Sequence, residues 1–309
     1  PGAHPLTTGM IGMHGSQASN VACNECDLLI AVGCRFSDRV ALQPDTFASQ
    51  AKIVHIDIDR SEIDKNVLTD HHIIGSAKRV LELLNERLPQ YHHQSWKEHI
   101  LPLREPQVVE EGDKLTPGQI LDAIEKAVPR DAIVATDVGQ HQMWSIQHFH
   151  FNYPGQLLTS GGFGTMGFGL GAAIGAKIGN PDKVVVHTTG DGCFRMNCHE
   201  LATVEHYHLP IITVVFNNGT LGMVRQWQHL IYHEHYSQTT LDRGPDFVKL
   251  AEAYGLKGKR VTNRAEMEQA LQEALSCGCG YVIDCQVDMD EMVRPMVAGG
   301  AHITDFLLK

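Results

Sequence analysis

The chain has 309 residues, a formal net charge of −11 at pH 7, and 43% hydrophobic against 20% charged residues. This composition is typical of a soluble globular protein with room for two domains, and the negative charge argues against a nucleic-acid-binding surface. No apolar run reaches the roughly 18 residues that a membrane span requires. The first residues, PGAHPLTTGM, contain no initiator Met, basic segment or apolar stretch. We therefore expect no signal peptide, and we expect the chain to be a piece of a longer one.

The eight cysteines are scattered along the chain, which favours a reduced, cytoplasmic protein. Cys23 and Cys26 form a C-x-x-C pair, but no second pair matches it, so we predict no zinc site there. The histidine-rich stretches QYHHQ and LIYHEHY are predicted to be solvated surface, because neither pairs histidines with a carboxylate at helical spacing.

Residues 1–90 show the pattern of an α/β domain. Apolar runs of strand length occupy 26–36 and 51–59, and apolar residues recur at helical spacing over 76–88. Strands that alternate with helices predict a parallel sheet. Residues 91–115 are polar and lie in a stretch that carries four prolines, so they are predicted to be an interdomain linker.

Residues 116–309 show a second and longer alternation. Thr116, followed by Pro117, predicts the start of a helix over 116–128. The other predicted strands are 131–139, 182–192, 209–219 and 280–288, and the other predicted helices fall in the second half of 159–179 and at 197–207, 221–230, 246–255 and 264–275. The predicted fold class is α/β, with two doubly wound parallel-sheet units.

Ligands of such sheets bind beyond the carboxyl ends of the strands. Three polar groups follow predicted strands directly, namely Asp137–Gly139, Gly190–Gly192 and Asn217–Thr220. The functional residues are therefore predicted at these three strand ends.

The glycines on either side of Asp191 allow the backbone to take positive φ and let a phosphate approach closely. A helix-like segment from Cys193 offers free N–H groups to an anion. A carboxylate beside a phosphate requires a cation, and Mg²⁺ suits Asp191 together with the Asn218 amide oxygen and the Thr220 carbonyl. Taken alone, each motif is better explained as a turn or a hairpin. Together, on strands that flank one helix, they favour a magnesium–diphosphate site.

The spacing of these motifs resembles a known cofactor motif. GDG at 190–192 is followed, after 24 residues, by NN at 217–218, as in the thiamine diphosphate binding motif. The stretches GQHQMW, TSGGFGTMGFGLGAAIGA, GMVRQWQ and VRPMVAGGA resemble the catalytic large subunits of the acetolactate synthase (acetohydroxyacid synthase) family. The stretches GMIGMHGSQASNVACNECDLLIAVGCRFSDRV and AKIVHIDIDRSEI resemble the central domain of that family, so the resemblance covers nearly the whole chain.

The resemblance implies a partial central, FAD-associated, Rossmann-like domain at 1–90 and a thiamine diphosphate-binding domain at 116–309. It implies Mg²⁺ ligands at three positions, Asp191, Asn218 and the carbonyl of Thr220. Two residues are implied as catalytic contacts of the bent cofactor, the supporting Met166 and the Gly164 carbonyl, which would accept from the 4′-amino group. The other implied contacts are Gln140, His141, Gly192, Cys193 and Leu221 for thiamine diphosphate, His14, Gly33, Arg35 and Asp57 for FAD, and Met223, Arg225 and Trp227 for substrate.

The activity that the resemblance implies is decarboxylation of pyruvate and condensation with a second 2-keto acid, pyruvate or 2-ketobutyrate. The products are 2-acetolactate and 2-aceto-2-hydroxybutyrate, in branched-chain amino acid biosynthesis. The resemblance also implies a homodimer or tetramer and a small regulatory subunit as a further partner, with no nucleic-acid or membrane partner. The family's activating glutamate lies in a first domain that these residues do not include, so we expect this chain alone to be inactive or nearly so.

The sequence departs from the family at Ser37 and Ser76, where the family has acidic residues, and at Gly171, where it usually has proline. Two alternative functions are another thiamine diphosphate enzyme (glyoxylate carboligase, pyruvate oxidase or a 2-keto acid decarboxylase) and a non-catalytic cofactor-binding module. An NAD-binding domain is disfavoured, because no G-x-G-x-x-G follows the first strand of either unit.

Overall fold

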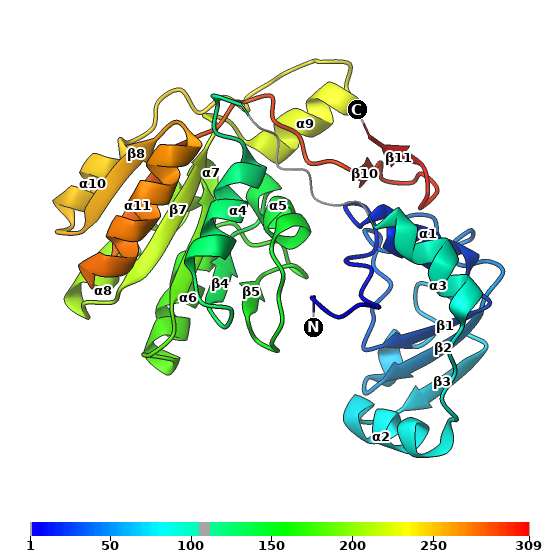
Figure 1. The fold of residues 1–309 in the computed structure, drawn as a ribbon. Coiled ribbons are helices and arrows are strands. Elements are labelled where there is room, and N and C mark those ends of the chain that lie inside the picture. Colours follow the sequence, from blue (N-terminus) through cyan, green and yellow to red (C-terminus); the bar gives the residue numbers. More distant parts are fainter. Residues whose placement is uncertain (1, 105–111, 309) are drawn as a thin grey trace. The chain divides into compact units, whose positions relative to one another are not determined.

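The computed structural model describes residues 2–104 and 112–308, and the chain divides into two compact units (Figure 1). The larger unit comprises Pro1–His4 and Gln107–Val293, and the smaller unit comprises Pro5–Pro106 and Arg294–Lys309. None of the described helices is long and apolar enough to cross a membrane.

The larger unit is built on a six-stranded sheet in which every neighbouring pair is parallel. Its strand order is β5-β4-β6-β7-β9-β8. The chain runs from β4 outward to β5 and then crosses back to β6 on the other side of β4, so the winding direction reverses there. The predicted α/β class with parallel sheets is confirmed. The strands are β4 (Ile133–Thr136), β5 (Leu157–Thr159), β6 (Val185–Gly190), β7 (Ile211–Asn217), β8 (Lys257–Val261) and β9 (Tyr281–Gln286).

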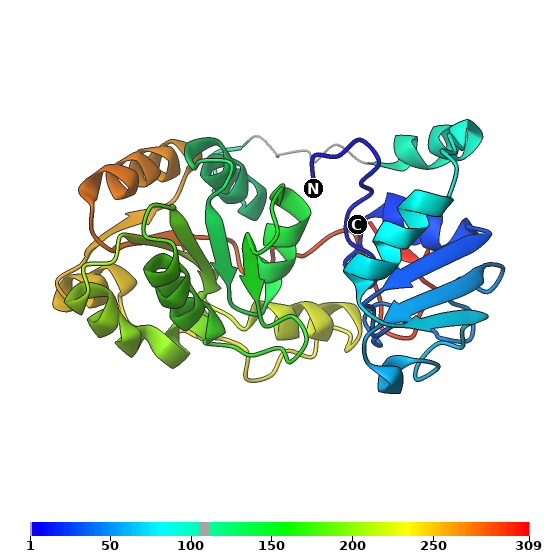
Figure 2. The ribbon, with the colours of Figure 1, turned by 90° about the horizontal axis from the view of Figure 1, so that it is seen from below.

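Helices cover both faces of this sheet, as Figure 2 shows from below. One layer contains α4 (Pro117–Ala127), α5 (Gln140–His148) and α11 (Arg264–Cys277). The other contains α6 (Phe168–Gly179), α7 (Asp191–Asn197), the 3₁₀ turn η3 (Cys198–Glu200), α8 (Leu201–His206) and α10 (Phe247–Ala253). Alternate residues of β7 serve the two layers, with Ile212 and Val214 in the first and Ile211 and Val215 in the second. A further helix, α9 (Gly222–Leu230), follows β7.

The predicted start of α4 is confirmed. The Thr116 hydroxyl accepts a hydrogen bond from the Gln119 backbone N–H at 3.3 Å, and the Gln119 side chain accepts from the Thr116 N–H at 3.2 Å. This capping box, with Pro117 at the first helical position, satisfies backbone donors that the helix itself leaves unpaired.

The smaller unit has a three-stranded parallel sheet in the order β1-β2-β3. Its strands are β1 (Leu28–Val32), β2 (Lys52–Asp57) and β3 (His71–Ile74), and β10 (Met296–Val297) pairs antiparallel with β11 (Phe306–Leu307). Its helical segments are α1 (Gln17–Glu25), η1 (Arg60–Glu62), α2 (Ala77–Arg87), α3 (Gln94–Ile100) and η2 (Leu101–Leu103).

Two predicted boundaries differ from the observed division. The expected linker 91–115 contains α3 and η2, and residues 105–111 of it lie outside the described residues. The C-terminal residues from Arg294 group with the smaller unit, although 116–309 was expected to be one domain. Two hydrogen bonds account for this, since Asn20 Nδ2 donates to the Ile303 carbonyl at 3.0 Å and Val297 N–H donates to the Met13 carbonyl at 2.6 Å.

Two glycines of α6 provide a matched stability test. A Cβ at Gly169 would lie 2.6 Å from His187 Nε2 and 2.9 Å from the Asp137 backbone nitrogen. A Cβ at Gly171 would meet no described atom within 4 Å beyond the neighbouring backbone of its own helix. We expect Gly169→Ala to lower the free energy of unfolding by about 1–3 kcal/mol through overpacking. Gly171→Ala should raise it by about 0.5–1 kcal/mol, since Ala favours the helix. Urea denaturation would measure both, and equal stability of the two variants would contradict the described packing.

Candidate functional site

The carboxyl ends of β4, β6 and β7 lie next to one another, because these strands are neighbours in the sheet. The three groups predicted from the sequence, Asp137–Gly139, Gly190–Gly192 and Asn217–Thr220, follow these strands directly. This edge also contains the reversal of winding beside β4, which is where doubly wound sheets bind ligands.

Asp191 is the first residue of α7 and is 2% exposed. Its Oδ1 accepts a hydrogen bond from the Gly192 N–H at 3.0 Å, whereas its buried Oδ2 has no hydrogen-bond partner among the described residues. Burial raises the pKa of this carboxyl to about 6, against the opposing effects of the Gly192 N–H and the Arg195 guanidinium. A buried carboxylate oxygen without a donor favours a bound cation, and Mg²⁺ accepts such hard oxygen ligands.

The loop after β7 is held in place by a second segment of chain. Leu221 N–H donates to the Thr239 carbonyl at 2.8 Å, and Leu241 N–H donates to the Gly219 carbonyl at 2.7 Å. Thr220 is buried, and its hydroxyl donates to the Thr239 carbonyl at 2.9 Å. Thr239–Leu241 therefore forms a short antiparallel pairing with Gly219–Leu221.

The two asparagines of this loop differ in their surroundings. Asn218 Oδ1 accepts from the Thr220 N–H at 3.2 Å, which keeps its amide within the loop. Asn217 Nδ2 instead donates to Asp284 Oδ1 at 2.8 Å. The amide of Asn217 is thus tied to Asp284 of β9, whereas the amide oxygen of Asn218 stays within the loop.

The GDG glycines do not use the positive φ that glycine allows. Gly190 has φ −89°, and Gly192 is not among the glycines with positive φ. Both positions require glycine because a side chain there would collide with a neighbouring side chain. A Cβ at Gly190 would lie 3.1 Å from His141 Nδ1, and one at Gly192 would lie 2.9 Å from Leu221 Cδ2. The helix also begins at Asp191, two residues before the predicted start.

Apolar side chains converge over the first turn of α7. Met166 Cε and Leu221 Cδ2 lie 3.7 and 2.9 Å from the position of a Gly192 Cβ. Gly164, on the segment that leads to α6, is exposed with φ +76°, and its N–H donates to the Ser160 carbonyl at 2.7 Å. The structure therefore brings Met166 and Leu221 together at the GDG turn.

Two buried polar side chains adjoin the same turn. Burial lowers the pKa of His141 to about 4, so its imidazole is neutral at pH 7, and its Nε2 has no partner among the described residues. Burial, followed by the charge of Asp137, raises the pKa of Cys193 to about 12, and its Sγ donates to the Val138 carbonyl at 3.2 Å. Cys193 is therefore not a reactive thiol, and only its backbone is suited to an anion.

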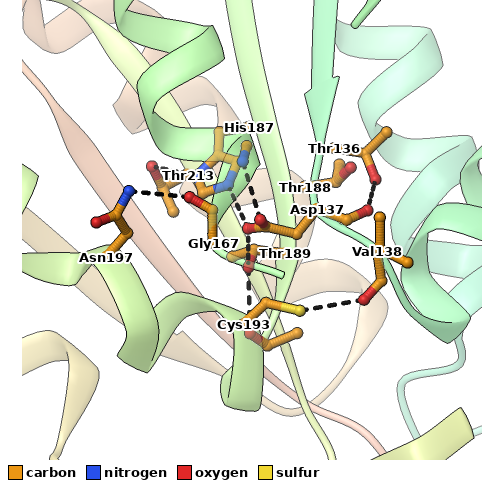
Figure 3. A network of polar contacts seen from close by, with 12 residues as sticks. Thr136, Asp137, Val138, Gly167, His187, Thr188, Thr189, Cys193, Asn197 and Thr213 are labelled. Carbon is orange, nitrogen blue, oxygen red and sulfur yellow. Dashed lines mark hydrogen bonds and ion pairs between the residues drawn. The ribbon is translucent and has the colours of Figure 1, made fainter. Parts of the chain in front are cut away.

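A buried network beneath this edge was missed from the sequence (Figure 3). Asp137 Oδ1 accepts from the Gly169 N–H at 2.9 Å, and Oδ2 accepts from the Thr189 hydroxyl at 2.7 Å and lies 3.1 Å from His187 Nε2. Burial alone would raise the pKa of Asp137, but His187 and the two donors outweigh it and hold that pKa well below its usual range. The network joins β4, β6 and the start of α6. The signal in the sequence that could have indicated this network is the presence of polar residues inside the buried strand VVVHTTG.

The predicted substrate residues lie along α9. Arg225 Nε and Nη2 donate to Asp290 Oδ1 at 3.0 and 2.7 Å, and its guanidinium carbon lies 4.1 Å from the centre of the Tyr236 ring. Met223 packs against the core, and Trp227 is half-buried. Arg225 is thus fixed by two neighbours, Asp290 and Tyr236.

The predicted FAD residues lie in the smaller unit. Gly33, with φ +61° and open space at its Cβ position, follows β1, and Asp57 ends the neighbouring strand β2. Asp57 Oδ2 lies 3.6 Å from Nε2 of the fully buried His55. Arg35 is exposed, and burial and the charge of Arg39 lower the pKa of His14 to about 4.

Residues 137–285 match the C-terminal TPP binding domain of thiamine pyrophosphate enzymes, and residues 1–84 match the central domain of these enzymes. The chain belongs to the thiamine pyrophosphate enzymes. It is 44% identical to the probable acetolactate synthase large subunit of Methanocaldococcus jannaschii, over 99% of this chain and 54% of that protein. It is 43% identical to the acetolactate synthase isozyme 2 large subunit of Escherichia coli, over 99% of this chain and 56% of that protein.

A third relative, the acetolactate synthase large subunit of Pyropia yezoensis, is 44% identical over 94% of this chain and 51% of that protein. The resemblance to acetolactate synthase large subunits that the motifs indicated is therefore confirmed. The chain spans about half the length of the curated relatives it matches.

Replacing Asp191 should separate stability from metal binding. At pH 8 the carboxylate is charged, and because its pKa is raised to about 6, this charge destabilises the metal-free chain. We expect metal-free Asp191→Asn to be more stable than the wild type by about 1–2 kcal/mol at this pH. Thermal unfolding with and without Mg²⁺ and thiamine diphosphate should show that the ligands raise the melting temperature of the wild type and of the control Asp182→Asn, whose side chain is exposed, but not that of Asp191→Asn. An Asp191→Asn variant that the ligands stabilise as much as the wild type would contradict the assignment.

Asp137→Asn should lower the free energy of unfolding by about 2–3 kcal/mol at pH 7, because it leaves the buried partners of the carboxylate without a charge. His187, His141 and Cys193 are the titratable groups that interact with Asp137. Since the folded pKa of Asp137 lies below the unfolded value, its stabilisation is present above about pH 4 and is lost as the pH falls further.

Urea denaturation from pH 8 to pH 3 would therefore show a constant difference between wild type and Asp137→Asn that shrinks below about pH 4. The exposed Asp182→Asn should remain within about 0.5 kcal/mol of the wild type. A difference that grows on acidification would show that the carboxyl is neutral in the folded chain.

Proposed function

We propose that this chain is the central and C-terminal part of an acetolactate synthase large subunit, with thiamine diphosphate and Mg²⁺ at the carboxyl edge of the six-stranded sheet. The observation that carries the proposal is the buried, unpaired Asp191 Oδ2 beside the Asn218–Thr220 loop. The names of the relatives, which are acetolactate synthase large subunits, support it.

The donor set at this edge fits Mg²⁺ carrying a diphosphate. Asp191 supplies one carboxylate, Asn218 supplies an amide oxygen and Thr220 supplies a backbone carbonyl, which are hard oxygen ligands. His141, buried and neutral, has an unpaired Nε2 and lies with its Nδ1 against Gly190. The first turn of α7 offers the backbone N–H groups of Gly192 and Cys193. Gln140 would act at the same site, where its Oε1 accepts a hydrogen bond from Asn218 Nδ2.

Bound thiamine diphosphate would supply the electron sink for decarboxylation of pyruvate. Met166 and Leu221, which converge over Gly192, would support the bend of the cofactor. The exposed Gly164 carbonyl would accept from its 4′-amino group. These residues would bind and orient the cofactor, while the reacting carbon atoms come from cofactor and substrate.

The substrates that we propose are pyruvate as donor and pyruvate or 2-ketobutyrate as acceptor. Residues Asn218–Thr220, which we call the metal loop, lie just before α9. Met223, Arg225 and Trp227 lie on α9 and are therefore placed to shape an acceptor pocket. The ion pair of Arg225 with Asp290 would hold that helix against the segment after β9.

We further propose FAD at the carboxyl edge of the β1-β2-β3 sheet. Gly33 follows Val32 of β1, and Asp57 follows Ile56, the residue of β2 that pairs with Val32. The space at Gly33 is open, which fits a dinucleotide bound at these strand ends. His14 and Arg35 would add contacts from the same unit. We also propose that the full-length subunit forms a homodimer or tetramer, binds a small regulatory subunit and is located in the cytoplasm.

Two measurements test the function. Calorimetric titration of the chain should show that thiamine diphosphate binds only when Mg²⁺ is present, and that Asp191→Asn abolishes this binding. This chain, joined to the part of the E. coli relative that it does not match, should form acetolactate from pyruvate, with Asp191→Asn in the same fusion as control. Acetaldehyde or acetyl phosphate as the main product would identify another thiamine diphosphate enzyme, and absence of Mg²⁺-dependent binding would overturn the cofactor assignment.

A further inference from the structure

Three side-chain amides form a continuous hydrogen-bonded row that ends at the metal loop. The row begins at Gln226 on α9, which is 3% exposed. The Val293 N–H donates to Gln226 Oε1 at 3.0 Å, and Gln226 Nε2 donates to the Val293 carbonyl at 3.1 Å. A backbone N–H and a backbone carbonyl cannot exchange roles, so this pair of bonds fixes which end of the Gln226 amide is oxygen.

Gln140, the first residue of α5, is the second member of the row and is 4% exposed. Its Nε2 donates to Gln226 Oε1 and to the Glu291 carbonyl, both at 2.9 Å. A flipped amide would place Oε1 against two acceptor oxygens, which cannot donate to it. The Gln140 oxygen must therefore occupy the other end of the amide.

Asn218, on the loop after β7, is the third member. Its Nδ2 donates to Gln140 Oε1 at 3.3 Å, and its Oδ1 accepts from the Thr220 N–H at 3.2 Å. Because Gln140 presents an oxygen, Asn218 must turn its amide nitrogen toward Gln140 on α5. Its amide oxygen then lies on the opposite side, toward the Thr220 backbone.

Gly222, the first residue of α9, leaves space for this row because it has no side chain. A Cβ at Gly222 would lie 1.9 Å from Gln140 Oε1 and 2.7 Å from Asn218 Nδ2. The φ of Gly222 is not positive, so space accounts for the glycine here. The contact is an observation independent of the hydrogen bonds, and it places the helix backbone directly against the joined amides.

We propose that Gln226 and Gln140 are positioning residues that fix the amide of Asn218 so that its oxygen faces Mg²⁺. The inference rests on the proposed metal site and adds the way in which one ligand is oriented. An amide nitrogen cannot coordinate Mg²⁺, so a flipped Asn218 would remove one ligand without any change in the sequence of the metal loop. Hydrogen-bond partners outside the ligand set orient ligands in metal sites generally.

Gln226→Met tests the row, because Met keeps the side-chain length and removes both the donor and the acceptor. Gln142→Met is the matched control, since Gln142 is a buried glutamine of α5 that donates to Thr159 Oγ1 at 2.7 Å and belongs to no part of the row. Calorimetry with Mg²⁺ at saturating thiamine diphosphate measures the metal affinity, and urea denaturation measures the stability of each variant. We expect Gln226→Met to weaken Mg²⁺ binding about 10-fold or more, and Gln142→Met to change it less than about 2-fold at comparable stability.

A second readout requires no ligand. In the metal-free wild type, the Asn218 side-chain amide should show distinct ¹⁵N–¹H resonances with slow exchange, and Gln226→Met should shift these resonances and speed their exchange. Equal Mg²⁺ affinity of the two Met variants, or unchanged Asn218 resonances in Gln226→Met, would overturn the proposal. If the wild type bound no Mg²⁺, the proposed function would fail, whereas the resonances would still decide whether the row orients Asn218.

Discussion

The parallel pairing of β4, β6 and β7 is the constraint on which the candidate site depends. It places three chain segments, far apart in sequence, at one edge of the sheet. Asp137 reinforces this pairing from below, because its carboxylate joins the end of β4 to Thr189 and His187 of β6 and to the start of α6. The position of Asp191 is thus determined by buried polar bonds as well as by the strand ladder.

The sequence was sufficient to predict the elements with strong periodicity or clear caps, such as α4 after Thr116 and the buried strand β7. It was insufficient for β5, which has three residues, and for β8, whose residues KGKRV are mostly polar at the edge of the sheet. The tail after Arg294 was expected with the larger unit but groups with the smaller one, because its hydrogen bonds to Asn20 and Met13 are long-range and leave no local pattern.

The candidate site divides in the same way. Asp191 and Asn218 could be predicted because strand ends followed by glycine and a polar residue have a recognisable spacing. Gln226 and His187 could not, since a polar residue inside a helix or a buried strand has no sequence signal for its distant partner. The reason for the GDG glycines also required coordinates. Their φ values are ordinary, and only the proximity of His141 and Leu221 explains them.

The pairing of Thr239–Leu241 with Gly219–Leu221 also has a kinetic consequence. Three hydrogen bonds join the two segments, from Leu221, Leu241 and the Thr220 hydroxyl. The segment Gly219–Leu221 is therefore one side of a small two-stranded ribbon, and it opens only when these bonds break together. Such concerted local unfolding is slower and less populated than the fraying of a single loop. Exchange of a ligand bound at this segment would then depend on the connection between α9 and α10.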